Sequence, residues 1–109
     1  GCDTFDCVLP TRNARNGRIL THEGRFNITN AKYKNDFSPL EEGCKCYTCS
    51  HFTKAYLSHL FRADEILGKT LASLHNIFFI ENLFQGIRNS IEEGTYQSFK
   101  DKFLEDYHI

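Results

Sequence analysis

The stretch Gly43-Cys44-Lys45-Cys46-Tyr47-Thr48-Cys49 places three cysteines within six residues. Three thiolates at this spacing converge on one metal ion when the backbone turns tightly, and Gly43 favours such a turn. Buried cysteines can also act as small apolar residues, but the residues around this cluster are typical of a polar loop and not of a core. The motif therefore predicts a zinc site built on sulfur ligands.

A tetrahedral zinc site built on three cysteines requires a fourth ligand. The candidates are His22, His51, His59 and His75. Spacing leaves the choice open between His51, which lies two residues after Cys49, and His75, which a returning helix could bring back to the thiolates. Four protein ligands leave no open coordination position, so the zinc is expected to stabilise the fold and not to take part in catalysis.

The chain after the cysteines has helical periodicity. One helix is predicted over residues 52–67, ended by Gly68, and a second from Thr70 to Gly94, because glycine commonly follows the last helical residue. A short terminal helix is predicted around residues 99–107. The predicted apolar faces consist of Phe52, Tyr56, Leu60, Ala63 and Leu67 in the first helix and of Ile77, Ile80, Phe84, Ile87 and Ile91 in the second.

The chain before the cysteines has strand-like and basic character. The apolar run Cys7-Val8-Leu9, closed by Pro10, predicts the end of a buried strand. Residues 18–29 predict a β-hairpin that turns at Glu23-Gly24, because Phe26 and Ile28 of the second arm alternate with polar residues and Gly24 permits a tight turn. Residues 11–34 are rich in arginine and lysine, whereas the net charge of the whole chain is −1, which excludes a uniformly basic nucleic-acid binder.

Composition sets the outer limits of the interpretation. The length of 109 residues corresponds to one domain at most, and the chain opens at Gly1 and contains no Met, so we expect a piece of a longer protein. Its helices have more apolar surface than the small hairpin can cover, which predicts packing on a larger body or self-association. No apolar run is long enough to span a membrane, and the odd number of clustered cysteines indicates reduced thiols and a cytoplasmic protein.

Three motifs follow one another in the chain: Asp6-Cys7-Val8-Leu9-Pro10-Thr11-Arg12-Asn13-Ala14-Arg15-Asn16-Gly17, then Cys44-x-Cys46-x-x-Cys49, then Leu74-His75-Asn76. Together they resemble the C-terminal part of the bacterial tRNA-guanine transglycosylases, also called queuine tRNA-ribosyltransferases. The resemblance implies an α/β fold, namely the C-terminal fragment of a (β/α)8 barrel with an inserted zinc subdomain. That subdomain would combine a short β-hairpin or three-stranded antiparallel sheet with two long antiparallel helices.

The same resemblance divides the chain and assigns its site residues. Residues 1–17 would form the end of a late barrel strand and an RNA-contacting loop, residues 18–69 the zinc subdomain, and residues 70–109 the C-terminal helices. Asp6 is implied as the nucleophile, although by residue type alone Asp3 could equally take that role. The implied RNA-contacting residues are Thr11, Arg12, Asn13, Ala14 and Arg15, and the implied zinc ligands are Cys44, Cys46, Cys49 and His75.

The implied reaction is a pentosyl transfer of queuosine biosynthesis. The wobble guanine of a tRNA anticodon would be exchanged for 7-aminomethyl-7-deazaguanine through a covalent bond between Asp6 and the ribose. The partners would be the tRNA anticodon loop, a guanine-type base and a second copy of the protein. A second aspartate and the base pocket would lie upstream, so the isolated piece is expected to be inactive. The alternatives are a zinc-dependent RNA-binding module and a dimerisation module, both without chemistry.

Overall fold

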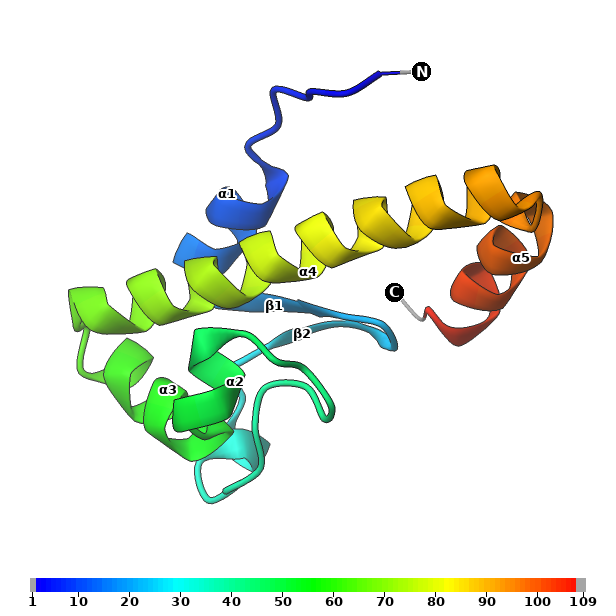
Figure 1. The fold of residues 1–109 in the computed structure, drawn as a ribbon. Coiled ribbons are helices and arrows are strands. Elements are labelled where there is room, and N and C mark those ends of the chain that lie inside the picture. Colours follow the sequence, from blue (N-terminus) through cyan, green and yellow to red (C-terminus); the bar gives the residue numbers. More distant parts are fainter. Residues whose placement is uncertain (1, 108–109) are drawn as a thin grey trace.

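The computed structural model describes residues 2–107 and consists of helices around one small hairpin (Figure 1). The elements in chain order are α1 (Leu9–Arg15), β1 (Arg18–Thr21), β2 (Gly24–Asn27), the 3-10 helix η1 (Ala31–Tyr33), α2 (Tyr47–His51), α3 (Lys54–Arg62), α4 (Ile66–Glu93) and α5 (Tyr96–Asp106).

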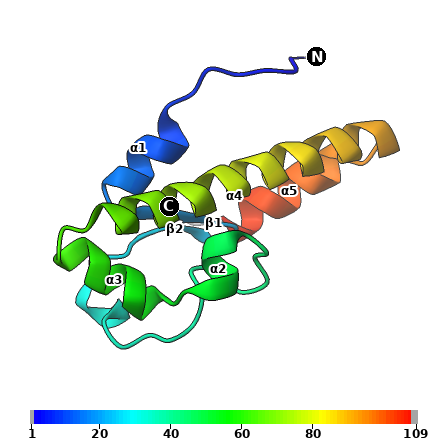
Figure 2. The same ribbon diagram turned by 60° about the vertical axis from the view of Figure 1, so that its left-hand side comes forward.

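The 28-residue helix α4 is the axis of the molecule. Helices α1, α2, α3 and α5 and strand β1 all contact it. Figures 1 and 2 show α1 on one side of its middle and the hairpin on the other. No helix among residues 2–107 has the length and apolar character needed to cross a bilayer.

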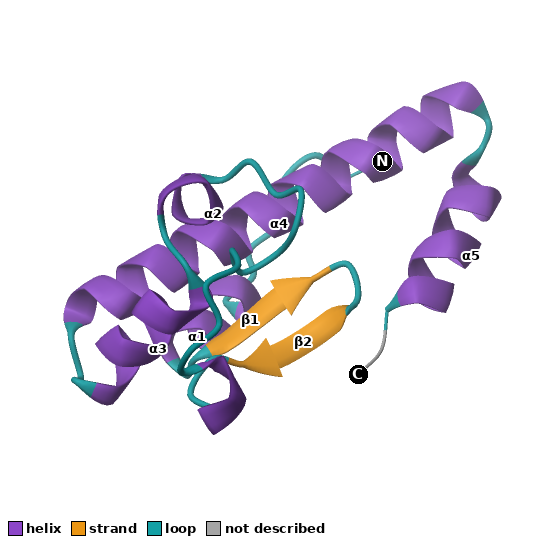
Figure 3. Cartoon of the chain, turned by 90° about the horizontal axis from the view of Figure 1, so that it is seen from below, coloured by secondary structure: helices purple, strands orange, loops and turns teal. Residues whose placement is uncertain are grey.

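The predicted hairpin is present with shorter strands (Figure 3). β1 pairs with β2 in antiparallel register, from Arg18 opposite Asn27 to Thr21 opposite Gly24. Gly24 has a φ of 128°, which a residue with a side chain rarely adopts, so it permits the tight turn. Within the described part of the chain the sheet has two strands, so the hairpin is confirmed and the three-stranded alternative is not.

The predicted strand end at Cys7-Val8-Leu9 is wrong. Residues 2–8 form no strand, Val8 and Leu9 are about half exposed, and Leu9 begins helix α1. Pro10 lies in the first turn of that helix, where its missing N–H costs nothing, so it opens a helix and does not close a strand. An isolated extended segment has no neighbouring strand to take up its backbone hydrogen bonds, and none is present in residues 2–107.

The predicted helix ends are half right. Gly94 ends α4 in the left-handed conformation, with φ of 73°, as predicted. Gly68 does not end a helix, because α3 already stops at Arg62 and Gly68 lies in the first turn of α4. It is buried there because α4 crosses α3 closely: a Cβ at this position would lie 3.0 Å from Leu60 Cβ. Glycine serves close approach at this site, not a positive φ.

The hydrophobic core lies between the hairpin, α1, α3 and the first half of α4. The predicted faces of the long helices were displaced from those that are buried: Ile77 and Ile91 are exposed, and so is Leu67. The polarity pattern of the sequence gives the wrong face because the inner face of α4 also carries buried polar residues. The core residues are Ala14, Ile19, Ile28, Tyr33, Leu40, Leu57, Leu60, Leu71 and Ala72.

Candidate metal centre

Four side chains converge at the first half of α4. One ligand atom each from Cys44, Cys46, Cys49 and His75 lies within 4.8 Å of all the others. His75 Nδ1 lies 3.6, 3.5 and 3.3 Å from the sulfurs of Cys44, Cys46 and Cys49. A tetrahedral zinc ion with ordinary bond lengths separates its nitrogen and sulfur ligands by about 3.6 Å. The group therefore fits one zinc ion.

The cysteines converge because a turn and a helix start meet in this short stretch. Gly43 has a φ of 80° and lets the backbone reverse before Cys44, whose N–H donates to the Glu41 carbonyl at 3.3 Å. Cys46 is the N-cap of α2, and its sulfur accepts from the Cys49 N–H at 3.3 Å. The cap turns the first helical turn so that Cys49 faces back toward Cys46.

His75 is placed by a hydrogen bond on its far side. It is fully buried on α4, and its Nε2 donates to the Leu20 carbonyl on β1 at 2.8 Å. Because a carbonyl can only accept, the proton is on Nε2 and the lone pair of Nδ1 faces the sulfurs. His51 lies exposed at the end of α2 against the ring of Tyr47, so the structure brings His75 and not His51 to the thiols.

The electrostatics of the cluster favour a bound cation. The pKa of Cys46 is lowered to about 4, mainly by a hydrogen bond from the Cys49 side chain and also by His75. The same hydrogen bond and burial raise the pKa of Cys49, and burial raises the pKa of Cys44. One thiolate thus forms easily while its neighbours resist ionisation, and a divalent ion would allow all three to ionise. With four protein ligands the ion has a structural role.

The predicted nucleophile lies outside this centre. Asp6 and Asp3 are exposed in the segment of residues 2–8. Two contacts attach that segment to the second half of α4: the Phe5 ring stacks on Phe84 at 5.0 Å between centroids, and Arg88 Nη2 donates to the Asp3 carbonyl at 3.1 Å.

The predicted RNA-contacting residues lie on a helix, α1, and not on a loop. The segment is helical because Pro10 favours a helix start and Ala14 packs against the core. Arg12 and Arg15 are exposed, whereas the Ala14 side chain is fully buried. The Thr11 hydroxyl donates to the Val8 carbonyl at 3.3 Å, which ties the start of α1 to the segment before it.

The structure adds contacts that sequence reasoning did not assign. Asn76 belongs to the motif Leu74-His75-Asn76, and its amide hydrogen-bonds to three backbone groups of α1 and β1. The Thr48 hydroxyl donates to the Leu71 carbonyl at 2.7 Å, which joins α2 to α4. A polar residue next to a metal ligand on the buried face of a helix is the signal that could have identified Asn76.

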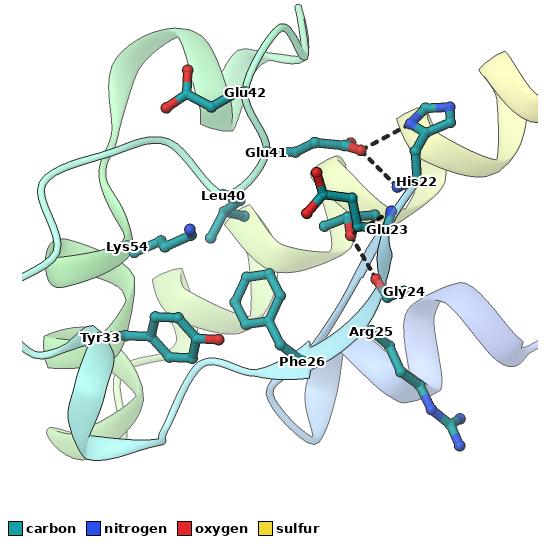
Figure 4. Close-up of a pocket in the computed structure, with 11 residues that line it drawn as sticks. His22, Glu23, Gly24, Arg25, Phe26, Tyr33, Leu40, Glu41, Glu42 and Lys54 are labelled. Atoms are coloured by element: carbon teal, nitrogen blue, oxygen red, sulfur yellow. Dashed lines mark hydrogen bonds and ion pairs between the residues drawn. The ribbon is translucent and has the colours of Figure 1, made fainter. Parts of the chain in front are cut away.

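A cavity of about 580 Å³ lies between the hairpin turn and the loop before the cysteines (Figure 4). At its edge the Glu41 carboxylate accepts from the N–H of His22 at 2.7 Å and lies 2.8 Å from its Nδ1. The Lys54 ammonium lies over the rings of Phe26 and Tyr33, at 5.4 and 5.5 Å. Lys54 Nζ also lies 3.7 Å from Asp36 Oδ2, so the contacts of Glu41 and Lys54 hold the loop to the hairpin.

Known proteins are similar in sequence to this chain. A family model described as queuine tRNA-ribosyltransferase matches residues 1–109. The chain is 56% identical over 108 residues to the queuine tRNA-ribosyltransferase of Helicobacter pylori strain P12 and 52% identical over 107 residues to that of Francisella tularensis subsp. novicida strain U112.

The chain belongs to the queuine tRNA-ribosyltransferase family. The two alignments cover 99% and 98% of this chain and 29% of each relative, so the chain spans less than a third of the relatives' length. The predicted family is confirmed, and so is the expected cofactor: the Cys3His group fits one structural zinc site in a queuine tRNA-ribosyltransferase chain.

Proposed function

We propose that this chain is the C-terminal part of an enzyme that exchanges the wobble guanine of tRNA for 7-aminomethyl-7-deazaguanine. The observation that carries the proposal is the family match over all 109 residues, which includes the string from Asp6 to Arg15. In the fold this string runs from an exposed carboxylate directly into a helix with two exposed arginines.

Asp6 supplies the nucleophile of this reaction. Its ionised carboxylate attacks ribose C1′, the bond from C1′ to guanine N9 breaks, and guanine leaves with the electron pair and takes up a proton. The incoming base loses its N9 proton and attacks C1′ from the vacated side, which breaks the ester to Asp6. Two inversions restore the configuration at C1′, as in retaining glycosidases.

Helix α1 supplies the contact with RNA. Arg12 and Arg15 are three residues apart, which places them on neighbouring positions of one helix face. Their guanidinium groups can bind phosphate or the acceptor edges of an unstacked base. The target base must leave its stack before C1′ can be attacked, so donors beside the nucleophile are required. Asn13 and Thr11 lie on the same short helix, and Ala14 secures it by packing.

The exposed apolar and aromatic side chains of this chain support two further parts of the proposal, a barrel around Asp6 and a second copy of the protein. Phe5 and Val8 are exposed before α1 begins at Leu9, so a strand of the whole protein would have to end by Asp6, and we place Asp6 at the C-terminal end of a (β/α)8 barrel strand. A second copy of the protein would cover exposed aromatic residues of the zinc subdomain, including Tyr47 and Tyr56. Zinc ligation through thiolates supports a cytoplasmic setting.

The test is incorporation of labelled guanine into tRNA by the full-length protein. Asp6→Asn should lower the rate at least about 1,000-fold and abolish a denaturation-resistant adduct with tRNA, because the amide is not a nucleophile. Asp3→Asn, the matched control three residues away, should stay within about threefold of the wild type. A non-catalytic RNA-binding or dimerisation module would show no exchange in either variant or in the wild type. The 109 residues alone are expected to be inactive.

A further inference from the structure

Asn76 occupies a position that no part of the proposed chemistry explains. It follows the zinc ligand His75 on α4, and its side chain is fully buried. Its Oδ1 accepts from the Leu20 N–H at 3.0 Å, and its Nδ2 donates to the carbonyls of Pro10 at 3.1 Å and Arg18 at 2.9 Å. The three backbone groups require one acceptor and two donors from the side chain. An amide provides them, whereas a carboxylate has no donors.

These three contacts span the corner between α1 and β1. Pro10 lies in the first turn of α1, and Arg18 is the first residue of β1. A single amide group therefore holds both sides of the turn at Asn16 and Gly17. The fully buried Ala14 faces the core, so this attachment also sets where the opposite face of α1, with Arg12 and Arg15, points.

Asn76 and His75 together occupy the free edge of the hairpin. One edge of β1 pairs with β2. On the other edge the Leu20 carbonyl accepts from His75, while the Leu20 N–H and the Arg18 carbonyl bind Asn76. Two consecutive side chains of a helix thus replace a third strand, and buried backbone groups left without them would cost free energy.

We propose that Asn76 is a positioning residue that transmits the rigidity of the zinc centre to the RNA-contacting helix α1. The ligand His75 is held by the Leu20 carbonyl on one side and would be fixed by bound zinc on the other. Its neighbour Asn76 then fixes α1 at an angle that presents Arg12 and Arg15 to tRNA. This inference rests on the proposed function for its tRNA readout, but its structural part does not.

The experiment compares Asn76→Ala with Thr48→Val in the full-length, zinc-loaded protein. Thr48 is the matched control because it is also fully buried and also hydrogen-bonds a backbone carbonyl near the cysteines, but it binds α4 and not α1. For Asn76→Ala, the KM for tRNA should rise about tenfold, while the KM for guanine and the zinc content stay unchanged. Thr48→Val should leave the KM for tRNA within about twofold of the wild type.

A readout without activity separates this inference from the proposed function. In Asn76→Ala the amides of residues 11–17 should exchange with solvent at least about tenfold faster, and in Thr48→Val they should not. If the wild type exchanges no guanine, the proposed function fails and amide exchange alone decides the role of Asn76. An unchanged rate of amide exchange in α1 of Asn76→Ala, or an equal increase in the KM for tRNA in both variants, would overturn the inference.

A second variant with a less disruptive substitution keeps the test decisive if Asn76→Ala loses zinc. If Asn76→Ala does not retain zinc, Asn76→Ser is measured in the same way, since its hydroxyl can keep one donor. Zinc-loaded Asn76→Ser with a raised KM for tRNA supports the inference. If both variants lose zinc, Asn76 belongs to the metal centre itself and the proposed link to α1 is wrong.

Discussion

The zinc-binding region, residues 18–79, and the segment of residues 2–8 are held in opposite ways. The zinc-binding region has a buried core and four converging metal ligands, and backbone groups on the outer edge of β1 are hydrogen-bonded by side chains of α4. The second is exposed and rests on α4 through one aromatic stack and one hydrogen bond. The zinc-binding region is therefore held by contacts among its own residues, whereas the segment with Asp6 has few contacts with the rest of residues 2–107.

The largest expected effect is removal of the zinc ligand His75. His75→Ala leaves three thiols with no nitrogen partner and should abolish tight zinc binding, which contributes on the order of 10 kcal/mol in small zinc domains. Far-ultraviolet circular dichroism and metal analysis should report loss of both structure and zinc. His51→Ala, the control at an exposed position, should keep one zinc per chain; equal loss in both variants would contradict the ligand assignment.

A smaller effect is expected at the crossing of α3 and α4. A Cβ on Gly68 would lie 3.0 Å from Leu60 Cβ and 3.5 Å from its backbone carbon, atoms that cannot move alone. Overpacking of this kind costs about 1–3 kcal/mol, and the better helix propensity of alanine offsets about 1 kcal/mol. Gly68→Ala should therefore lower the free energy of unfolding of the zinc-loaded protein by about 1 kcal/mol in chemical denaturation. An increase in stability would mean that the crossing is looser than described.

Gly86 provides the counterpart outside the zinc-binding region. Its Cβ would lie 2.9 Å from Phe99 Cζ, at the free end of a side chain on α5. Phe99 can turn away at a cost that the helix propensity gained, about 1 kcal/mol, offsets, so Gly86→Ala should leave the denaturation midpoint unchanged. The amides of α5 should exchange faster. A destabilisation as large as that of Gly68→Ala would show that α5 is part of the core.

A similarly small effect on stability is expected for Arg88→Ala. Arg88 is exposed and donates to the Asp3 carbonyl, so its loss should change the free energy of unfolding by less than about 0.5 kcal/mol. It should increase amide exchange in residues 3–7, measured by mass spectrometry. Unchanged exchange there would mean that the segment is held by other contacts.

Features that depend on residues close together in the chain could be predicted from the sequence. The cysteine spacing, the hairpin around Gly24 and the end of α4 at Gly94 were foreseen because each depends on local backbone geometry. The choice of His75 over His51 could not be made from spacing, because it depends on how α4 returns past β1. Gly68 and the run from Cys7 to Leu9 were misread because close helix crossing and strand pairing are set by distant parts of a fold.

The most direct test of the central claim is amide exchange with and without a zinc chelator, in the full-length protein. A metal centre that organises residues 18–79 predicts that chelation deprotects the hairpin, α2, α3 and the first half of α4 together, and that zinc restores their protection. If those amides stay protected in metal-free protein, the zinc centre does not hold this region and the account is contradicted.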